Sequence, residues 1–166
     1  MKNKGLTLIE LMIATFVIVI GVVGSFSVLQ KVIMSTTLSS SRLVAAYLAQ
    51  EGIEVVRNIR DTNWVEGEDW DNDISYVAGS KYLDYRSVSY PDSANCSSKN
   101  YLKYNQASGF YECSINGNFQ RTISVESIGG GEEGIKVLVK VEWEELGSVH
   151  EVSAQENLYN WYNPGE

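Results

Sequence analysis

The stretch KGLTLIELMIATFVIVIGVVGSFSVLQK, residues 4–31, decides how this chain folds. Between Leu11 and Gln30 there is no charged residue, and 14 of these 20 residues are Leu, Ile, Val, Met, Phe or Ala. Twenty helical residues at about 1.5 Å each reach roughly 30 Å, the thickness of the hydrocarbon core of a bilayer. The segment therefore predicts a membrane-spanning helix.

One residue in this stretch does not fit a plain anchor. Glu10 lies inside an apolar run, residues 6–13, where an unpaired carboxylate costs about 2 to 3 kcal/mol. It needs a cation, and cleavage after Gly5 would place the new α-amine of Leu6 one helical turn away, in the same chain or a neighbouring one. The alternative is a secretory signal or simple signal anchor. A secretory signal has a shorter apolar region and is followed by an A-x-A-like cleavage site, which is missing here. Neither alternative explains Glu10.

The residues Lys4-Gly5-Leu6-Thr7-Leu8-Ile9-Glu10, with the apolar run behind them, resemble the class III signal of type IV pilins and type II secretion pseudopilins. The resemblance covers about the first 30 residues. It implies a leader peptide, residues 1–5, that a membrane-embedded prepilin peptidase removes by cutting between Gly5 and Leu6 on the cytoplasmic side. It also implies N-methylation of Leu6 by the same enzyme. The basic residues before the apolar run place the N-terminus in the cytoplasm by the positive-inside rule.

The pattern changes from uniformly apolar to amphipathic between residues 36 and 60, which contain no proline and one glycine. One helical stripe at spacings of three, four and seven holds Val44, Ala45, Leu48, Ala49, Gly52, Val55, Val56 and Ile59. We expect one long helix from Leu6 to about Ile59, facing lipid over residues 6–30 and packing on a soluble domain over residues 31–60. Gly52 weakens this helix by about 1 kcal/mol unless close packing uses its missing side chain.

Residues 61–166 are expected to form the globular domain outside the cytoplasm. Residues 101–104 and 110–113 predict a hairpin, and residues 119–128, 135–143 and 148–158 predict a three-stranded antiparallel meander joined by short turns. A long helix laid on a small antiparallel sheet of about three to four strands is an α+β fold, the architecture of pilins. Residues 119–125 and 137–143 also resemble minor pilins of the PilV type and minor pseudopilins of the GspI type.

Two cysteines bracket the predicted hairpin. Cys96 and Cys113 lie 17 positions apart in a domain placed outside the cytoplasm, so we expect them to form a disulfide. Two unpaired thiols are the alternative, because reducing environments exist outside cells as well.

A weak metal signal lies in the acidic run at residues 66–73. Asp69, Asp71 and Asp73 have the alternate spacing that begins a calcium loop, but Ile74 replaces the expected glycine and Ser80 the bidentate glutamate. A solvated acidic loop explains the run better, so we expect no metal and no cofactor.

The sequence offers no catalytic constellation. His150 is the only histidine, and neither a Gly-x-Ser-x-Gly motif, a phosphate-binding glycine loop nor a Cys/His cluster is present. A net charge of -8 also argues against a nucleic-acid partner.

These features predict a structural subunit, not an enzyme. The resemblance implies a single-pass protein of the cytoplasmic (inner) membrane that later packs with other pilin subunits into a type IV pilus or related pseudopilus. Its partners would be the prepilin peptidase, the other subunits and an ATPase-driven assembly machinery. The alternative is a membrane-tethered extracellular binding or adhesion module that does not polymerise, in which the aromatic loops of residues 61–118 hold a ligand. Glu10 separates the two hypotheses, because a monomeric tether has no use for that carboxylate.

Overall fold

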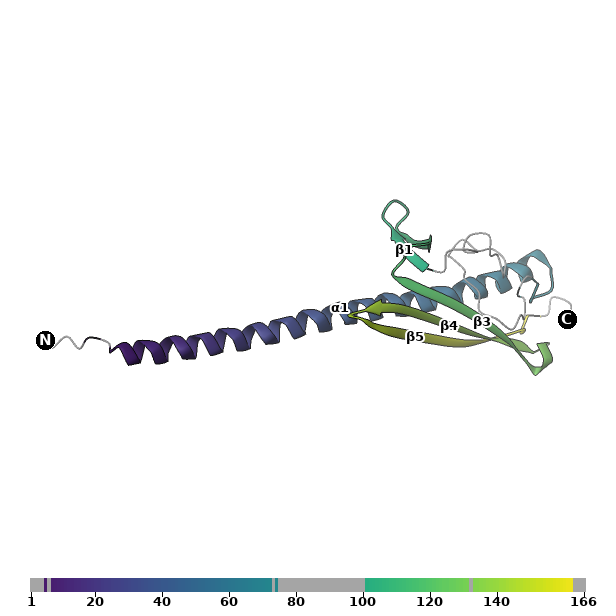
Figure 1. Cartoon of the computed structure of the whole chain (residues 1–166). Coiled ribbons are helices and arrows are strands. Elements are labelled where there is room, and N and C mark those ends of the chain that lie inside the picture. Colours follow the sequence, from purple (N-terminus) through teal and green to yellow (C-terminus); the bar gives the residue numbers. More distant parts are fainter. Residues whose placement is uncertain (1–4, 6, 73, 75–100, 132, 163–166) are drawn as a thin grey trace. The chain divides into compact units, whose positions relative to one another are not determined.

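The structure is a computed structural model that describes residues 5, 7–72, 74, 101–131 and 133–162. Helix α1 spans Leu8–Glu66, and the strands of the described residues form one antiparallel sheet in the order β2-β1-β3-β4-β5 (Figure 1). The chain therefore has the predicted α+β, pilin-like fold. The strands are β1 (Tyr101–Asn105), β2 (Phe110–Ser114), β3 (Phe119–Ile128), β4 (Gly134–Glu145) and β5 (Ser148–Tyr159), with a short 3-10 turn at Gly129–Gly131.

The meander of β3, β4 and β5 confirms the prediction from residue alternation. β3 pairs with β4 along its whole length, and β4 pairs with β5 from end to end. Leu138, which breaks the alternation of β4, is 37% exposed on the face away from the core. The inward side chains of β4 that have no exposed surface are Ile135, Val137, Val139 and Val141.

The sheet of the described residues has five strands, slightly more than the three to four predicted, because the hairpin of β1 and β2 joins the meander. The junction is a single pairing of Leu102 with Phe119. The backbone N–H of Asn118 donates to the carbonyl oxygen of Leu102 at 3.2 Å. Gly117 lies so close to this strand that an added Cβ would clash with the Leu102 backbone. Because the hairpin joins β3 through one glycine and one residue pair, no periodic pattern in the sequence predicts this contact.

The chain divides into two compact units, residues 1–41 and 42–166. In the second unit, α1 lays an apolar stripe on the sheet as predicted, except that Val44 is half-buried. An added Cβ at Gly52 would lie 2.9 Å from Cγ1 of Val139, so the close packing anticipated for this glycine is present. The buried helix residues are Ala45, Leu48, Ala49, Gly52, Ile53, Val55, Val56, Ile59, Arg60 and Asn63.

Two arginines tie the helix to the sheet. The side chain of Arg121, on β3, has no exposed surface, and its Nη1 donates to the Leu48 carbonyl at 3.0 Å and to Oε1 of Glu51 at 2.9 Å. Arg57, on α1, donates through Nη2 to both carboxylate oxygens of Glu156, on β5, at 2.5 and 2.6 Å. This hydrogen bond is the main reason why the pKa of Arg57 is raised. The two contacts fix where the helix lies along the sheet.

The helix does not end near Ile59, as the sequence predicted, but at Glu66. Gly67 follows with a φ of 76°, the left-handed conformation that glycine adopts readily at a helix end. The N–H of Glu68 donates to the Asn63 carbonyl at 2.9 Å, which completes a Schellman motif. The apolar stripe ends at Ile59, so in the sequence only Gly67 indicates that the helix ends later.

Candidate assembly and processing site

The first turn of α1 carries a capping box built from Thr7 and Glu10. The Glu10 N–H donates to Oγ1 of Thr7, and the Thr7 N–H donates to Oε2 of Glu10, both at 3.4 Å. This arrangement satisfies two backbone donors that have no partner inside the helix. The sequence analysis missed it, although Thr-x-x-Glu before an apolar run is its known signature.

The cap gives Glu10 hydrogen bonds but no opposite charge. Within the described part of the chain, Glu10 has no ion-pair partner, and Leu8, Ile9 and Leu11 around it are 76%, 67% and 58% exposed. Neutral hydrogen bonds lower the cost of a carboxylate in an apolar layer without removing the cost of its charge. Glu10 is therefore a capped anion that still lacks a cation.

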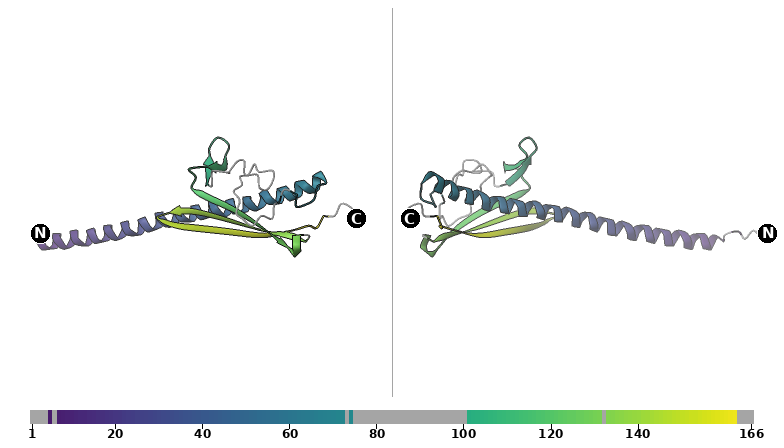
Figure 2. Two further views of the ribbon diagram at one scale, coloured as in Figure 1. Left: turned by 45° about the vertical axis from the view of Figure 1, so that its right-hand side comes forward. Right: turned by 180° about the vertical axis from the view of Figure 1, so that it is seen from behind.

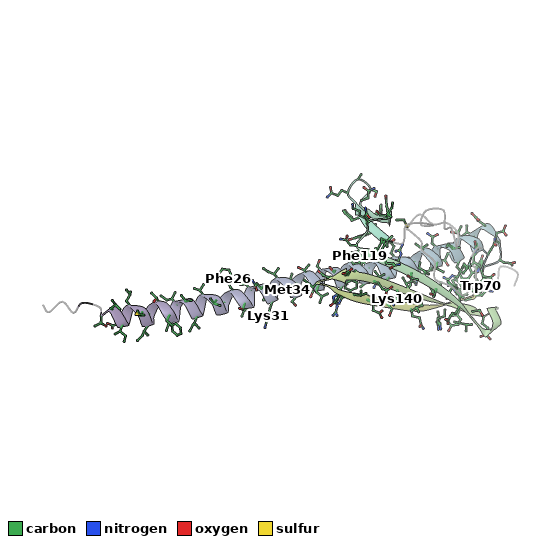
Figure 3. The ribbon with its side chains drawn as sticks, in the orientation of Figure 1. Phe26, Lys31, Met34, Trp70, Phe119 and Lys140 are labelled. Carbon is green, nitrogen blue, oxygen red and sulfur yellow. The ribbon has the colours of Figure 1, made fainter. Side chains whose placement is uncertain are left out.

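The helix surface around and beyond Glu10 is apolar and uncovered. Every residue from 8 to 37 is exposed, and Phe26 and Met34 stand out from α1 as Figure 3 shows. By length and composition, α1 is able to cross a membrane. An uncovered surface of this size belongs either in lipid or against other apolar helices.

The predicted cleavage site lies just before this helix. Gly5 is exposed, and an added Cβ would meet nothing within 4 Å. Leu6 lies outside the described residues, so the cut between Gly5 and Leu6 and the methylation of Leu6 stay predictions.

The structure describes one member of the predicted disulfide. Cys113 is half-buried on β2 and is disulfide-bonded rather than a thiol. Cys96 lies outside the described residues, so its pairing with Cys113 stays a prediction.

The described residues of the acidic run that follow α1 form turns. The N–H groups of Asn72 and Ile74 donate to the carbonyls of Asp69 and Asp71 at 2.8 and 3.0 Å. Among the described residues, no three His, Cys, Asp or Glu side chains come together as a metal site. Asp73 lies outside the described residues, so the calcium candidate is untested.

An aromatic cluster lies where the end of α1 meets the C-terminal segment. Trp64 contacts Trp161 edge-on with ring centroids 5.0 Å apart, and Tyr162 at 5.7 Å. The Arg60 guanidinium covers the Trp64 ring at 4.5 Å. A cavity of about 380 Å³ is lined by these three aromatic residues together with Asp61 and Val65. It is the feature that bears most directly on the binding-module hypothesis.

The single histidine is part of the packing of the sheet. His150 stacks on Trp143, with ring centroids 5.5 Å apart and planes inclined by 28°. Trp143 in turn donates its indole N–H to Glu145 at 3.2 Å. These contacts explain the position of His150 without a chemical role.

Comparison with known proteins gives one result for the region that carries these N-terminal features. The family model described as the prokaryotic N-terminal methylation motif matches residues 1–26. No curated protein and no solved structure matches the chain. The matched residues include Gly5, Thr7 and Glu10, so the motif and the capped anion are the same site. The chain thus carries a prepilin methylation motif at the head of a pilin-like fold, which supports a prepilin of the type IV pilin and pseudopilin family.

Proposed function

We propose that this chain is a structural subunit, a minor pilin, of a type IV pilus or related pseudopilus. It is inserted in the cytoplasmic membrane with its N-terminus inside, cut after Gly5 and N-methylated at Leu6 by a prepilin peptidase. It then polymerises with other subunits through α1 into an extracellular filament. The minor role rests on the resemblance of residues 119–125 and 137–143 to minor subunits.

The observation that carries this proposal is the position of Glu10. Its carboxylate lies within the matched motif, on an exposed apolar helix, without a cation among the described residues. Transfer of such helices from lipid to a shared helical core keeps the apolar surface buried. It also brings the carboxylate near the Leu6 amine of another subunit. An ion pair in this low-dielectric core makes assembly selective for correctly processed chains.

The mature N-terminus tests the processing steps. Intact-mass analysis of the protein from membranes and from sheared filaments should give a chain that begins at Leu6 and carries one methyl group. Gly5→Leu should leave uncut precursor in the membrane, whereas Gly21→Leu, a matched change within the span, should still be cut. A chain that starts at Met1, or after Gln30, in wild-type filaments would refute the proposal.

The disulfide between Cys96 and Cys113 is part of the same proposal, since the domain matures outside the cytoplasm. Alkylation without reduction should label neither cysteine in freshly isolated protein. Ready labelling of Cys96 would show that another arrangement holds Cys113.

The aromatic cavity supports a second candidate, a tethered module that binds a ligand. Trp161 is 70% exposed beside Trp64, and exposed tryptophans are frequent anchors in binding sites. On this hypothesis Trp161→Ala would abolish surface adhesion of cells, while Glu10→Gln would change nothing. For a pilin subunit we expect the opposite result: Glu10→Gln abolishes surface adhesion of cells, and Trp161→Ala leaves it unchanged.

A further inference from the structure

The loop between β2 and β3 holds the only Asn-Gly pair of the chain, Asn116-Gly117. In Figure 2 the hairpin of β1 and β2 rises from the start of β3, and this loop makes the connection. Asn116 is exposed and Gly117 is half-buried. Because glycine has no side chain, nothing on Gly117 shields its backbone nitrogen from the amide group of Asn116. The pair therefore combines an accessible amide with an unshielded backbone, at the point where two parts of the sheet join.

The groups of this pair that can react are not held by hydrogen bonds. The N–H of Asn116 donates to Oγ of Ser114 at 3.3 Å and so helps to form the turn. Within the described residues, neither the side-chain amide of Asn116 nor the N–H of Gly117 forms a hydrogen bond. The amide of Asn105, in the same hairpin, donates instead to Glu112 at 3.0 Å. The amide of Asn116 can thus turn toward the backbone of Gly117, whereas that of Asn105 is held.

This arrangement permits a reaction in two covalent steps. The backbone nitrogen of Gly117 attacks the side-chain amide carbon of Asn116, and the new C–N bond closes a succinimide ring. The C–N bond to the amide nitrogen breaks, and the proton of the Gly117 N–H passes through solvent to that nitrogen, so ammonia leaves. Water then opens the ring at one of its two carbonyls and gives aspartate or isoaspartate. Since both reacting groups belong to adjacent residues, ring closure is a unimolecular step.

Isoaspartate adds one carbon atom to the main chain, at a place that has no room for it. An added Cβ at Gly117 would lie 2.6 Å from the carbonyl carbon of Leu102. The N–H of Asn118 donates to the carbonyl oxygen of that same Leu102 at 3.2 Å. The pair Leu102 and Phe119 is the junction of β1 with β3 in the described part of the chain. A longer main chain before Gly117 therefore displaces the residues that make this junction.

We propose that Asn116-Gly117 is a site of spontaneous deamidation and isomerisation in the folded chain, and that the isoaspartate product releases the hairpin of β1 and β2 from β3. The reaction needs no enzyme, and water is its co-reactant. Every group involved lies in the unit of residues 42–166, so the inference does not rest on the proposed function. The consequence is a chain that loosens at one hairpin as it ages, while the meander of β3, β4 and β5 keeps its pairing.

The first experiment asks whether the folded chain reacts. Full-length protein is incubated in detergent at neutral pH, digested at acidic pH and analysed by mass spectrometry, with isoaspartate detected by enzymatic methylation. Conversion should occur at Asn116 and not at Asn118, which is also exposed but precedes Phe119. Asn116→Gln moves the amide carbon one bond farther from the Gly117 nitrogen and should slow the reaction about a hundredfold. If the folded chain stays unmodified while the guanidinium-unfolded chain reacts, the fold protects the pair and the inference is wrong.

The second experiment asks whether the product releases the hairpin. Amide hydrogen exchange is compared between fresh wild type, the isoaspartate form purified from aged protein, and freshly prepared Asn116→Asp. In the isoaspartate form the Asn118 N–H should exchange about tenfold faster, because its hydrogen bond to Leu102 is lost. The amides that pair β4 with β5 are the internal control and should exchange as in fresh protein.

Asn116→Asp separates the added charge from the added carbon atom. It carries the charge of the deamidated product on a main chain of ordinary length, so its Asn118 N–H should exchange as in fresh wild type. Equal exchange of this N–H in the fresh and isoaspartate forms would refute release of the hairpin. Exchange in Asn116→Asp as fast as in the isoaspartate form would mean that the charge loosens the junction, and the inference would again be wrong.

Discussion

The two halves of α1 show how one helix meets two different surroundings. From residue 8 to 37 no side chain is buried, although most are apolar. From residue 45 to 63 ten residues are buried inside the second unit. The first half must find its burial outside the chain, in lipid or against other helices, whereas the second half finds it on the sheet. Mutations in the second half should therefore change folding, and mutations in the first half should change insertion or assembly.

The largest effect on folding is expected at Arg121. Arg121→Ala removes a fully buried side chain and its hydrogen bonds to Leu48 and Glu51. The free energy of unfolding should therefore fall by about 3 kcal/mol. Guanidinium unfolding of the full chain in detergent, followed by tryptophan fluorescence, measures this. The control Arg42→Ala changes an exposed arginine and should shift stability by less than about 0.5 kcal/mol. Equal midpoints for Arg121→Ala and Arg42→Ala would mean that the buried arginine does not hold the helix on the sheet.

A glycine from each half sharpens the comparison. Gly52→Ala pushes a Cβ against Val139 and should cost about 1 to 2 kcal/mol after the gain in helix propensity. Gly24→Ala meets nothing within 4 Å, so the second unit should unfold as in wild type. Thermal unfolding followed by near-ultraviolet circular dichroism compares the two. A stabilising Gly52→Ala would show that the helix is not held so close to β4.

The capping box predicts a smaller, local effect in the first half. Thr7→Val removes the hydroxyl that accepts from the Glu10 N–H, at a cost of about 1 kcal/mol. Amide hydrogen exchange at residues 8–11 in detergent micelles should become about fivefold faster. Thr15→Val is the control, because the Thr15 hydroxyl bonds carbonyls already used by the helix. Equal exchange in both variants would argue that Thr7 does not cap α1.

The smallest effect concerns an ion pair on the outer face of the sheet. Hydrogen bonds to Glu151, and then to Glu142, raise the pKa of Lys140 above its ordinary value of 10.5. Because the pKa of Lys140 is raised in the folded state, the stabilisation from these ion pairs is complete below pH 10.5. It is lost as the pH rises through the pKa of the folded state. The small difference in thermal midpoint between wild type and Lys140→Met should therefore vanish at strongly alkaline pH. A difference that grows with pH would contradict the assigned pairs.

The sequence predicted those parts of the fold that repeat a periodic pattern. The alternation of β4 and the stripe of α1 follow directly from which side chains enter the core, so the sequence predicts both, although α1 continues beyond its stripe to Glu66. Arg121 could not be recognised as a core residue, because its partners Leu48 and Glu51 lie about seventy positions earlier. The joining of β1 to β3 likewise depends on one pair, Leu102 and Phe119, and on space left by Gly117.

The candidate site was predictable in its chemistry and not in its geometry. Glu10 stood out because a charge in an apolar run is costly, and residues 1–26 match the methylation motif. Its capping bonds to Thr7 follow from the Thr-x-x-Glu spacing and are a second role of the carboxylate, independent of its charge. The aromatic cavity at Trp64 was not predictable, because Trp161 and Tyr162 join it from the far end of the chain.

The incorporation of Glu10→Gln into filaments tests the central claim most directly. Glutamine preserves the capping box and removes only the charge, so insertion and folding of the second unit should be unchanged. Loss of one partner of a buried ion pair costs about 3 to 5 kcal/mol, so the share of this protein in sheared filaments should collapse relative to the membrane pool. Glu126→Gln, which removes a carboxylate paired with Lys136 on the sheet, should incorporate normally. Equal incorporation of Glu10→Gln and wild type would contradict assembly through Glu10 and would favour the tethered module.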